Sequence, residues 1–129
     1  MILLDTHALV WAVADSRRLS RAAASAIRRA RGSDGVAISA ISLWELAALI
    51  SRGRIQAYAT IDSTLAQLTE GVAIRPITPK IAVVATQFPD SYSHNPADRL
   101  IGATARCEAL FLVTRNENMR GSPLLRTIW

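Results

Sequence analysis

Short apolar runs alternate along the chain with amphipathic segments of helical period, a pattern typical of a parallel sheet covered by helices. Strands are predicted over four apolar runs, and a short edge strand near the end of the chain would make a fifth. These segments are residues 2–5, 36–39, 72–75 and 111–114, with 127–129 as the edge strand. The pattern therefore predicts an α/β fold with a four- or five-stranded parallel sheet.

Helices are predicted between these strands, and several of their ends carry the expected capping signals. Ser20 is an N-cap residue, Gly53 a C-terminal stop, and Thr78 precedes a proline at the first helical position. The predicted helices cover residues 6–13, 21–31, 42–52, 61–70, 79–87 and 96–107 or 108. Residues 88–95 are polar and are expected to form a surface loop, and 116–122 a loop or short helix.

Composition places limits on the class of protein. With 50% hydrophobic residues, a chain of 129 residues has enough apolar surface for one packed core, so we expect a single domain over residues 1–129. No apolar run approaches the roughly 18 residues that a membrane span requires, and Asp5 leaves no room for a signal sequence. We therefore expect a cytoplasmic protein without membrane contact. The single cysteine, Cys107, excludes a disulfide framework within the chain.

The charge balance favours an anionic partner. Lysine and arginine together number 15 against 10 acidic residues, and Lys80 is the only lysine. The planar guanidinium of arginine suits phosphate recognition, so RNA or DNA is a plausible partner. Arginines that contact an acidic protein would give the same balance.

Three carboxylates lie in apolar segments, where a charge is costly. Asp5 ends the first strand, Glu45 lies on the inward face of its helix, and Asp98 is in the first turn of another helix. Buried carboxylates normally become neutral or find a cation. Open parallel sheets bind ligands at the carboxyl ends of their strands, where Asp5 is placed. If the three acids converge, a divalent metal ion is the natural partner.

Each acid also has an ordinary structural explanation. Asp5 is placed to cap the helix that follows it, and Glu45 to pair with an arginine such as Arg52. Asp98 is placed as a cap or helix-dipole acid beside Arg99. Three independent explanations do not require all three acids to share one end of a sheet, so we favour a joint role.

Aromatic and histidine side chains are given structural roles. Trp11 and Trp44 fall on apolar helix faces and are interpreted as core or dimer contacts rather than base-stacking platforms. His7 lies at a helix start. Because the sequence shows no nucleophile partnered with it, we expect a structural role for His7 rather than an acid-base role.

Five short segments carry a resemblance to a known family. They are Leu3-Leu4-Asp5-Thr6-His7, Ser42-Leu43-Trp44-Glu45-Leu46, Pro96-Ala97-Asp98-Arg99-Leu100-Ile101, Leu112-Val113-Thr114-Arg115 and Thr127-Ile128-Trp129. In this order and spacing, the chain resembles the PIN-domain ribonucleases of the VapC toxin type. The resemblance implies a three-layer α/β/α PIN-like domain with Mg²⁺- or Mn²⁺-dependent endoribonuclease activity. It also implies a VapB-like antitoxin partner and a homodimer; the helices within residues 15–30 and 42–58 are candidates for the antitoxin groove.

The resemblance assigns Asp5, Glu45 and Asp98 as the catalytic, metal-binding acids. The family's fourth acid would follow Thr114-Arg115, where this chain has Asn116. The amide offers a neutral oxygen in place of a carboxylate, and the adjacent Glu117 is an alternative donor. We therefore expect one firmly bound ion rather than two.

The expected mechanism is in-line attack on a phosphodiester by metal-activated water. Thr6 and Thr114 are expected to supply supporting hydroxyls. Arg99 and Arg115 are expected to contact either the RNA backbone or a neighbouring acid.

Two other interpretations remain at the sequence level. The first is a catalytically weakened PIN-like scaffold, because Asn116 replaces an acid. The second is an aspartyl-phosphate enzyme or receiver domain with Asp5 as phosphoacceptor, which is poorly supported because Asp5 lacks an adjacent acid.

Overall fold

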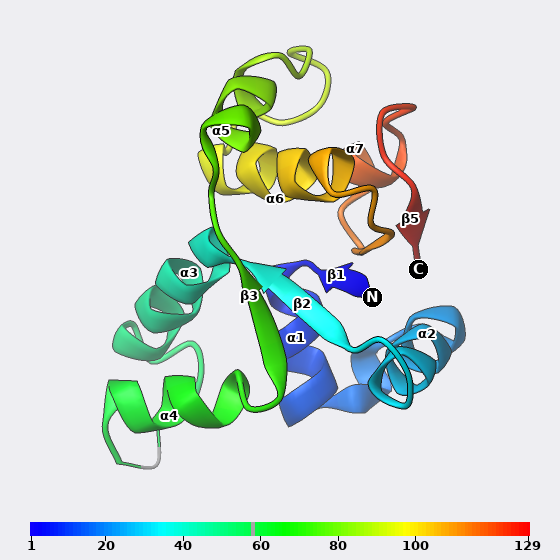
Figure 1. Ribbon diagram of the computed structural model, residues 1–129. Helices are drawn as coiled ribbons and strands as arrows, with labels where there is room; N and C mark the ends of the chain where they lie inside the picture. The colour runs from blue at the N-terminus through cyan, green and yellow to red at the C-terminus, as the bar shows by residue number, and fades with distance from the viewer. Residues whose placement is uncertain (58) are drawn as a thin grey trace.

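A five-stranded, all-parallel sheet forms the centre of the molecule (Figure 1). The structure, a computed structural model, describes residues 1–57 and 59–129, so that Tyr58, the end of one candidate groove segment, lies outside it. The sheet order is β3-β2-β1-β4-β5. The strands are β1 (Ile2–Leu4), β2 (Val36–Ser39), β3 (Val72–Arg75), β4 (Leu112–Val113) and β5 (Thr127–Ile128). The predicted α/β class is confirmed, including the fifth strand at the edge.

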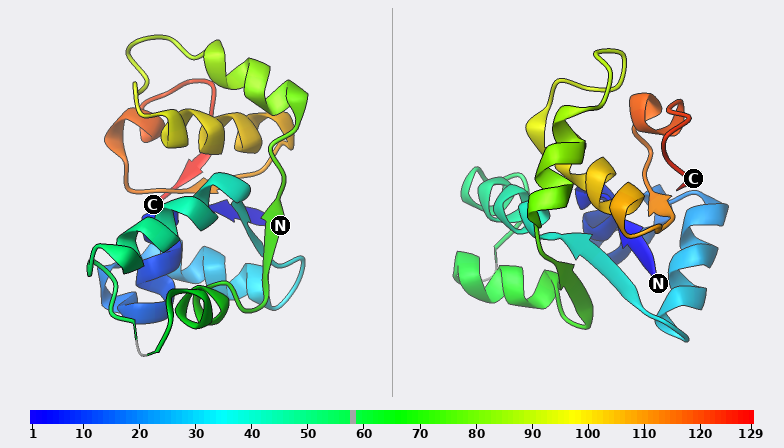
Figure 2. Two further views of the ribbon diagram at one scale, coloured as in Figure 1. Left: turned by 90° about the vertical axis from the view of Figure 1, so that its left-hand side faces the viewer. Right: turned by 45° about the horizontal axis from the view of Figure 1, so that its top comes forward.

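Helices cover both faces of this sheet. In Figures 1 and 2, α5, α6 and α7 lie on one side, and α1 to α4 lie on the other. The helices are α1 (Thr6–Ala14), the 3-10 turn η1 (Ser16–Arg18), α2 (Arg21–Arg31), α3 (Ala40–Ser51), α4 (Ile61–Leu68), α5 (Pro79–Thr86), α6 (Pro96–Cys107) and α7 (Glu117–Arg120). None of the helices in the described residues is long and apolar enough to cross a membrane.

Alternating side chains of the strands build two separate cores. Leu4, Ile38 and Val113 pack into the core shared with α1, α2, α3 and α4. Their neighbours Leu3 and Ala37 point to the opposite face and pack into the core under α5 and α6. Because strand side chains alternate with a period of two, one apolar run serves both layers. The arrangement is the three-layer α/β/α sandwich.

Local capping explains where the helices begin. Ser39 Oγ accepts a hydrogen bond from the backbone N–H of Ile41 at 3.3 Å, so α3 begins at Ala40, two residues before the predicted start. Thr78 caps α5 through the backbone N–H of Ile81, with proline at the first helical position as predicted.

The predicted surface loop at 88–95 is partly wrong. Phe88 is 5% exposed and Tyr92 2% exposed, and their rings stack with centroids 4.3 Å apart. A side chain on Gly102 of α6 would meet both rings, so the glycine makes room for them. The polar composition of the loop hid two aromatic anchors that fasten it to the core.

Trp44 also departs from expectation. Its side chain is 65% exposed, so the core interpretation of this tryptophan is wrong, whereas Trp11 is half-buried and packs against Trp129. The apolar pattern of α3 predicted a buried Trp44, but the helix buries Leu46 and Ile50 on a narrower face than its sequence suggests.

The strand order creates a switch point beside β1. The chain runs from β1 to β2 and β3 on one side, then returns to place β4 on the other side of β1. Parallel α/β sheets bind ligands where the carboxyl ends of such strands diverge. Asp5 follows β1 and Thr114 follows β4, so both lie at this point.

Candidate active site

Asp5 lies at the switch point and is 4% exposed. Its backbone N–H donates to the carbonyl oxygen of Val113 at 3.0 Å, which fixes the residue between β1 and β4. One carboxylate oxygen accepts from the backbone N–H of Thr6 at 2.8 Å, and the other from the Thr114 hydroxyl at 2.7 Å. Asp5 therefore caps α1 and also presents a hydrogen-bonded carboxylate at the sheet edge.

Glu45 reaches the same region from α3. Its Oε1 accepts from the Thr6 hydroxyl at 2.5 Å, and that hydroxyl also lies 2.8 Å from the hydroxyl of Ser42. Burial raises the pKa of Glu45, and the negative charges of Asp5 and Asp98 raise it further. None of the ion pairs among the described residues joins Glu45 to an arginine, so the alternative pairing with Arg52 is wrong.

Asp98 enters from the first turn of α6. Its Oδ2 accepts from the Ser93 hydroxyl at 2.9 Å, and its backbone carbonyl accepts from the Tyr92 hydroxyl at 2.8 Å. Burial raises the pKa of Asp98, and the charge of Asp5 adds to this effect. The loop at 88–95 thus holds the residue at both its carboxylate and its backbone.

The three acids share one arrangement: each carboxylate binds a hydroxyl from its own surroundings. Thr114, Thr6 and Ser93 are the donors. The charge of Asp5 is close enough to raise the pKa of both Glu45 and Asp98, and the charge of Asp98 raises that of Glu45.

They are not drawn around a single point, however. Within residues 1–57 and 59–129, no three His, Cys, Asp or Glu side chains are grouped closely enough to hold one metal ion. The structure brings the acids to one site but leaves each on its own hydroxyl, because like charges repel and hydroxyl donors are near.

The donor set nevertheless suits a hard divalent cation. The acids offer only oxygen, which Mg²⁺ and Mn²⁺ prefer. Burial raises the pKa values of Glu45 and Asp98, because a carboxylate charge is costly away from water. A cation between these acids would compensate that charge, so the residues fit such an ion chemically.

His7 lies between Asp5 and the segment that follows β4. Its Nε2 accepts from the backbone N–H of Arg115 at 3.0 Å, so its proton is on Nδ1, which lies 3.5 Å from Asp5 Oδ2. Burial lowers the pKa of His7, although Asp5 and Asp98 oppose that shift. The neutral ring therefore links α1 to the segment after β4, in keeping with the structural role predicted for it.

Asn116 and Glu117 follow β4 but do not join the acids. The backbone N–H of Asn116 donates to the Thr114 hydroxyl at 3.0 Å, and its side-chain oxygen caps α7 through Met119 at 3.2 Å. Glu117 lies exposed in the first turn of α7. Asn116 thus supports Thr114, which in turn donates to Asp5.

Arg99 holds the loop before α6. Its guanidinium donates to the carbonyl oxygens of Ser93 at 2.6 Å and Phe88 at 2.8 Å, and to two more at 3.3 Å on Ala85 and Pro89. Within the described chain, it makes no ion pair with a neighbouring acid. Its geometry is that of a clamp on the backbone rather than a free cation.

Sequence reasoning missed three polar side chains of the site: Ser42, Tyr92 and Ser93. Ser42 precedes Glu45 by three residues and shares its helix face, so the spacing could have predicted that Ser42 lies in the site. Tyr92 and Ser93 act through the folded path of their loop, which no periodicity encodes.

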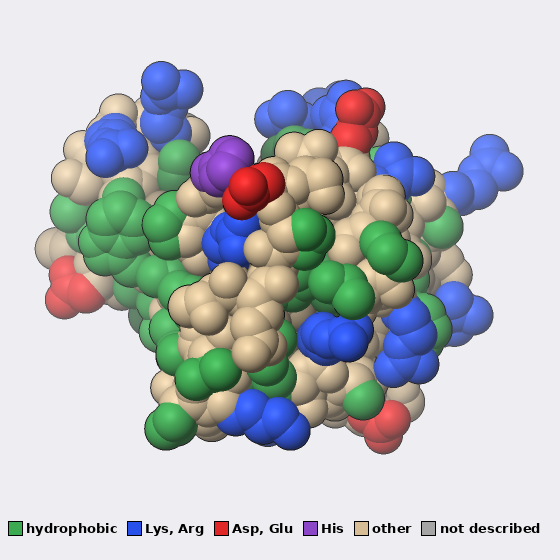
Figure 3. Space-filling model, turned by 90° about the horizontal axis from the view of Figure 1, so that it is seen from above, with side chains coloured by type: hydrophobic (Ala, Val, Ile, Leu, Met, Phe, Trp, Pro, Cys, Tyr) green, Lys and Arg blue, Asp and Glu red, His purple; other side chains and the backbone are tan. Residues whose placement is uncertain are grey.

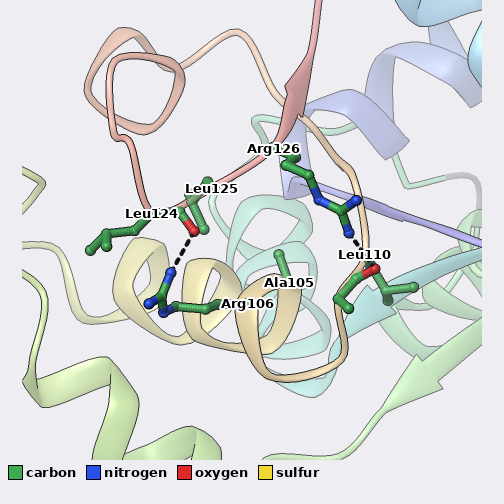
Figure 4. A pocket seen from close by; sticks show the side chains of 7 residues that line it. Ala105, Arg106, Leu110, Leu124, Leu125 and Arg126 are labelled. Atoms are coloured by element: carbon green, nitrogen blue, oxygen red, sulfur yellow. Dashed lines mark hydrogen bonds between the residues drawn. The ribbon is translucent and has the colours of Figure 1, made fainter.

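A separate cavity of about 280 Å³ lies at the other end of α6 (Figure 4). Its two arginines serve the fold: Arg106 donates to the carbonyl of Leu124 at 3.0 Å, and Arg126 to that of Ala109 at 2.8 Å.

Lys and Arg side chains are spread over the face seen in Figure 3, where few acidic side chains appear.

Comparison with known proteins gives a consistent set of relatives. A family model described as PIN domain matches residues 2–121. The chain is 42% identical over 130 residues to Ribonuclease VapC22 of Mycobacterium tuberculosis, an alignment that covers 99% of this chain and 98% of that protein.

Solved structures show the same fold. VapBC2 from Rickettsia felis, bound to a DNA fragment from its promoter, matches with a TM-score of 0.76 at 22% identity and covers 98% of this chain and 97% of that chain. A toxin-antitoxin complex from Klebsiella pneumoniae matches with a TM-score of 0.67 at 25% identity, covering 97% and 95%.

Proposed function

We propose, because the chain belongs to the PIN-domain family and to its VapC group, that it is a toxin endoribonuclease that cleaves RNA with a divalent metal ion. The observation that carries the proposal is that Asp5, at the switch point, and Glu45 both accept hydrogen bonds from Thr6, while Asp98 is close enough for its charge to act on Glu45. Two of these carboxylates have raised pKa values. We also propose that residues 1–129 form one catalytic domain.

Asp5 and Asp98 are proposed to bind the ion directly, with Mg²⁺ or Mn²⁺ as the candidates. Glu45 is proposed to bind it through water or to orient the attacking water. When bound, the ion neutralises phosphate charge and lowers the pKa of a coordinated water. Thr6 and Thr114 hold Glu45 and Asp5 by the hydroxyl bonds described above.

The replacement of a fourth acid by Asn116 favours a single firmly held ion. The Asn116 side-chain oxygen is used in capping α7, and Glu117 is exposed. Arg115 is exposed beside the site and is proposed to contact RNA. Arg99, committed to four carbonyl oxygens, is proposed to act only by holding the loop that carries Ser93.

A VapB-like antitoxin is the proposed protein partner, because the matched structures are toxin-antitoxin complexes. A cavity of about 270 Å³ between α1, η1 and α2, lined by residues that include Leu19 and Ile27, is the proposed place for an apolar antitoxin segment. We also propose a homodimer, for which the exposed Trp44 is a candidate contact, and a cytoplasmic site of action, where RNA is available.

The test is cleavage of end-labelled single-stranded RNA in Mg²⁺, Mn²⁺ or a chelator. Wild type is expected to cleave only with metal, and Asp5→Asn and Asp98→Asn to lose activity by about a hundredfold or more. Circular dichroism confirms that the variants fold. Cleavage that survives both substitutions, or that continues in chelator, contradicts the mechanism.

A catalytically weakened scaffold is the second candidate, because Asn116 offers no charge to a metal. If wild type is inactive and Asn116→Asp restores metal-dependent cleavage, this second candidate is correct. The receiver-domain alternative is set aside, since the chain belongs to a different family.

A further inference from the structure

Two arginines from distant parts of the chain lie against one indole beside the candidate active site. The Arg18 Cζ, from η1, is 4.4 Å from the centroid of the Trp11 ring, and the Arg115 Cζ, after β4, is 5.9 Å from it. Trp11 is itself held by His7 and Trp129, with ring centroids 4.9 Å and 5.7 Å away. The indole of Trp11 therefore has two guanidinium groups within 5.9 Å of its centroid.

Among the residues that the structure describes, neither of these guanidinium groups has a partner for its N–H donors. In the described residues, the side chains of Arg18 and Arg115 make no hydrogen bond and no ion pair, and both are exposed. By contrast, Arg99 and Arg126 donate to carbonyl oxygens, and Arg75 donates to Glu108.

Like charges held together need compensation. The ring face of Trp11 attracts both cations but accepts none of their planar N–H donors, which are matched to the oxygens of a phosphate. An anion with several oxygens is the group that would complete this arrangement.

The position of the pair relates it to the reaction site. Arg115 donates its backbone N–H to His7 Nε2, and His7 Nδ1 lies 3.5 Å from Asp5 Oδ2. Only the His7 ring thus separates the backbone of Arg115 from the carboxylate of Asp5, which is proposed to bind the metal ion.

We propose that Arg18 and Arg115, arranged by Trp11, form a clamp for a phosphate next to the one that is cleaved. The inference rests on the proposed function, because it assigns the anion to an RNA substrate. Arg18 and Arg115 are binding residues in this account, and Trp11 is a positioning residue. The clamp reads backbone charge and not base identity.

The test measures binding without turnover. Fluorescein-labelled oligouridylate is titrated with the purified full chain in chelator, and anisotropy gives the affinity at several KCl concentrations. Arg18→Gln and Arg115→Gln are each expected to weaken binding by roughly three- to tenfold at low salt. Each should also reduce the slope of log affinity against log salt by up to about 0.7, the contribution of one phosphate contact on a single strand.

Arg17→Gln is the matched control. Arg17 is adjacent to Arg18 and carries the same charge, but its side chain is paired with Asp15 at 3.2 Å and is 92% exposed. It should leave the affinity and the salt slope near wild-type values. Trp11→Leu, with no change of charge, should weaken binding, whereas Trp11→Phe, which keeps an aromatic face, should retain most of it.

Three outcomes overturn the clamp: unchanged slopes in both arginine variants, an equal loss in Arg17→Gln, or equal displacement of the RNA by polyglutamate of matched charge. The last result would assign the pair to protein carboxylates. The proposed function is judged separately by metal-dependent cleavage. If wild type binds RNA with the expected salt slope but does not cleave it, the clamp is supported and the proposed endoribonuclease activity is contradicted.

Discussion

Gly102→Ala gives the sharpest test of how the loop at 88–95 supports the site. Alanine is the better helix former, so an exposed position in α6 would gain up to about 1 kcal/mol. At this buried position, the added Cβ would lie 3.1 Å from the Tyr92 Cζ and 3.2 Å from the Phe88 Cζ, and closer still to the Tyr92 hydroxyl. The stacked rings must therefore move.

The expected balance is unfavourable. Overpacking of a buried position typically costs about 1–3 kcal/mol, which exceeds the gain in helix propensity. We expect a net loss of about 1–2 kcal/mol in the free energy of unfolding, or a Tm lower by roughly 3–8 °C. Because Tyr92 donates to the Asp98 carbonyl and Ser93 to its carboxylate, metal-dependent cleavage should fall as well.

A double-variant cycle with Tyr92→Phe separates the contact from general damage. Tyr92→Phe alone removes one hydrogen bond and should cost about 1 kcal/mol. In that background the nearest clash is gone, so Gly102→Ala should cost at least about 1 kcal/mol less than it does in wild type. Urea unfolding followed by circular dichroism measures all four proteins. Greater stability in Gly102→Ala, or an equal cost in both backgrounds, refutes the reasoning.

Three further predictions concern the acids and their supports. Ser93→Ala removes the hydrogen bond that lowers the pKa of Asp98, so the acid limb of the pH profile of kcat/KM should move to higher pH. Activity should also fall by about tenfold or more. An acid limb that does not move would contradict the role of Ser93. Glu45→Gln should stabilise the metal-free protein at neutral pH in thermal unfolding. Because the pKa of Glu45 is raised in the fold, its contribution to stability is full below the ordinary carboxyl range and is lost as pH rises, so the gain should vanish below about pH 4. Arg99→Lys should lower the free energy of unfolding by about 2 kcal/mol in urea, because an ammonium cannot span four carbonyl oxygens; no change would mean that these bonds are dispensable.

Much of the fold was predictable because its strands and helices obey simple periodicities. The buried runs at β1, β2 and β4 serve two cores at once, which gives them their continuous apolar sequence. Cap residues such as Ser20 and Thr78 marked helix starts within the chain itself. These signals are local, so sequence alone carries them.

The contacts that orient the acids were harder to predict. Asp5 was identified from its place at the end of a buried strand, and Thr6 and Thr114 were expected to supply supporting hydroxyls. Ser93 reaches Asp98 only because Tyr92 anchors the loop beneath α6, a contact that depends on tertiary packing. Arg99 was expected to meet RNA or an acid, but its donors meet carbonyl oxygens that only the folded loop brings together.

Mn²⁺ binding and RNA cleavage followed in one titration test the proposed metal dependence most directly. Electron paramagnetic resonance of free Mn²⁺ gives the bound fraction, and the cleavage rate of labelled RNA is measured at each concentration. We predict that wild type binds one Mn²⁺ and that the rate saturates with the same midpoint, while Asp98→Asn loses both. Cleavage that proceeds without bound Mn²⁺, or a variant that binds and cleaves as wild type does, would contradict the central claim.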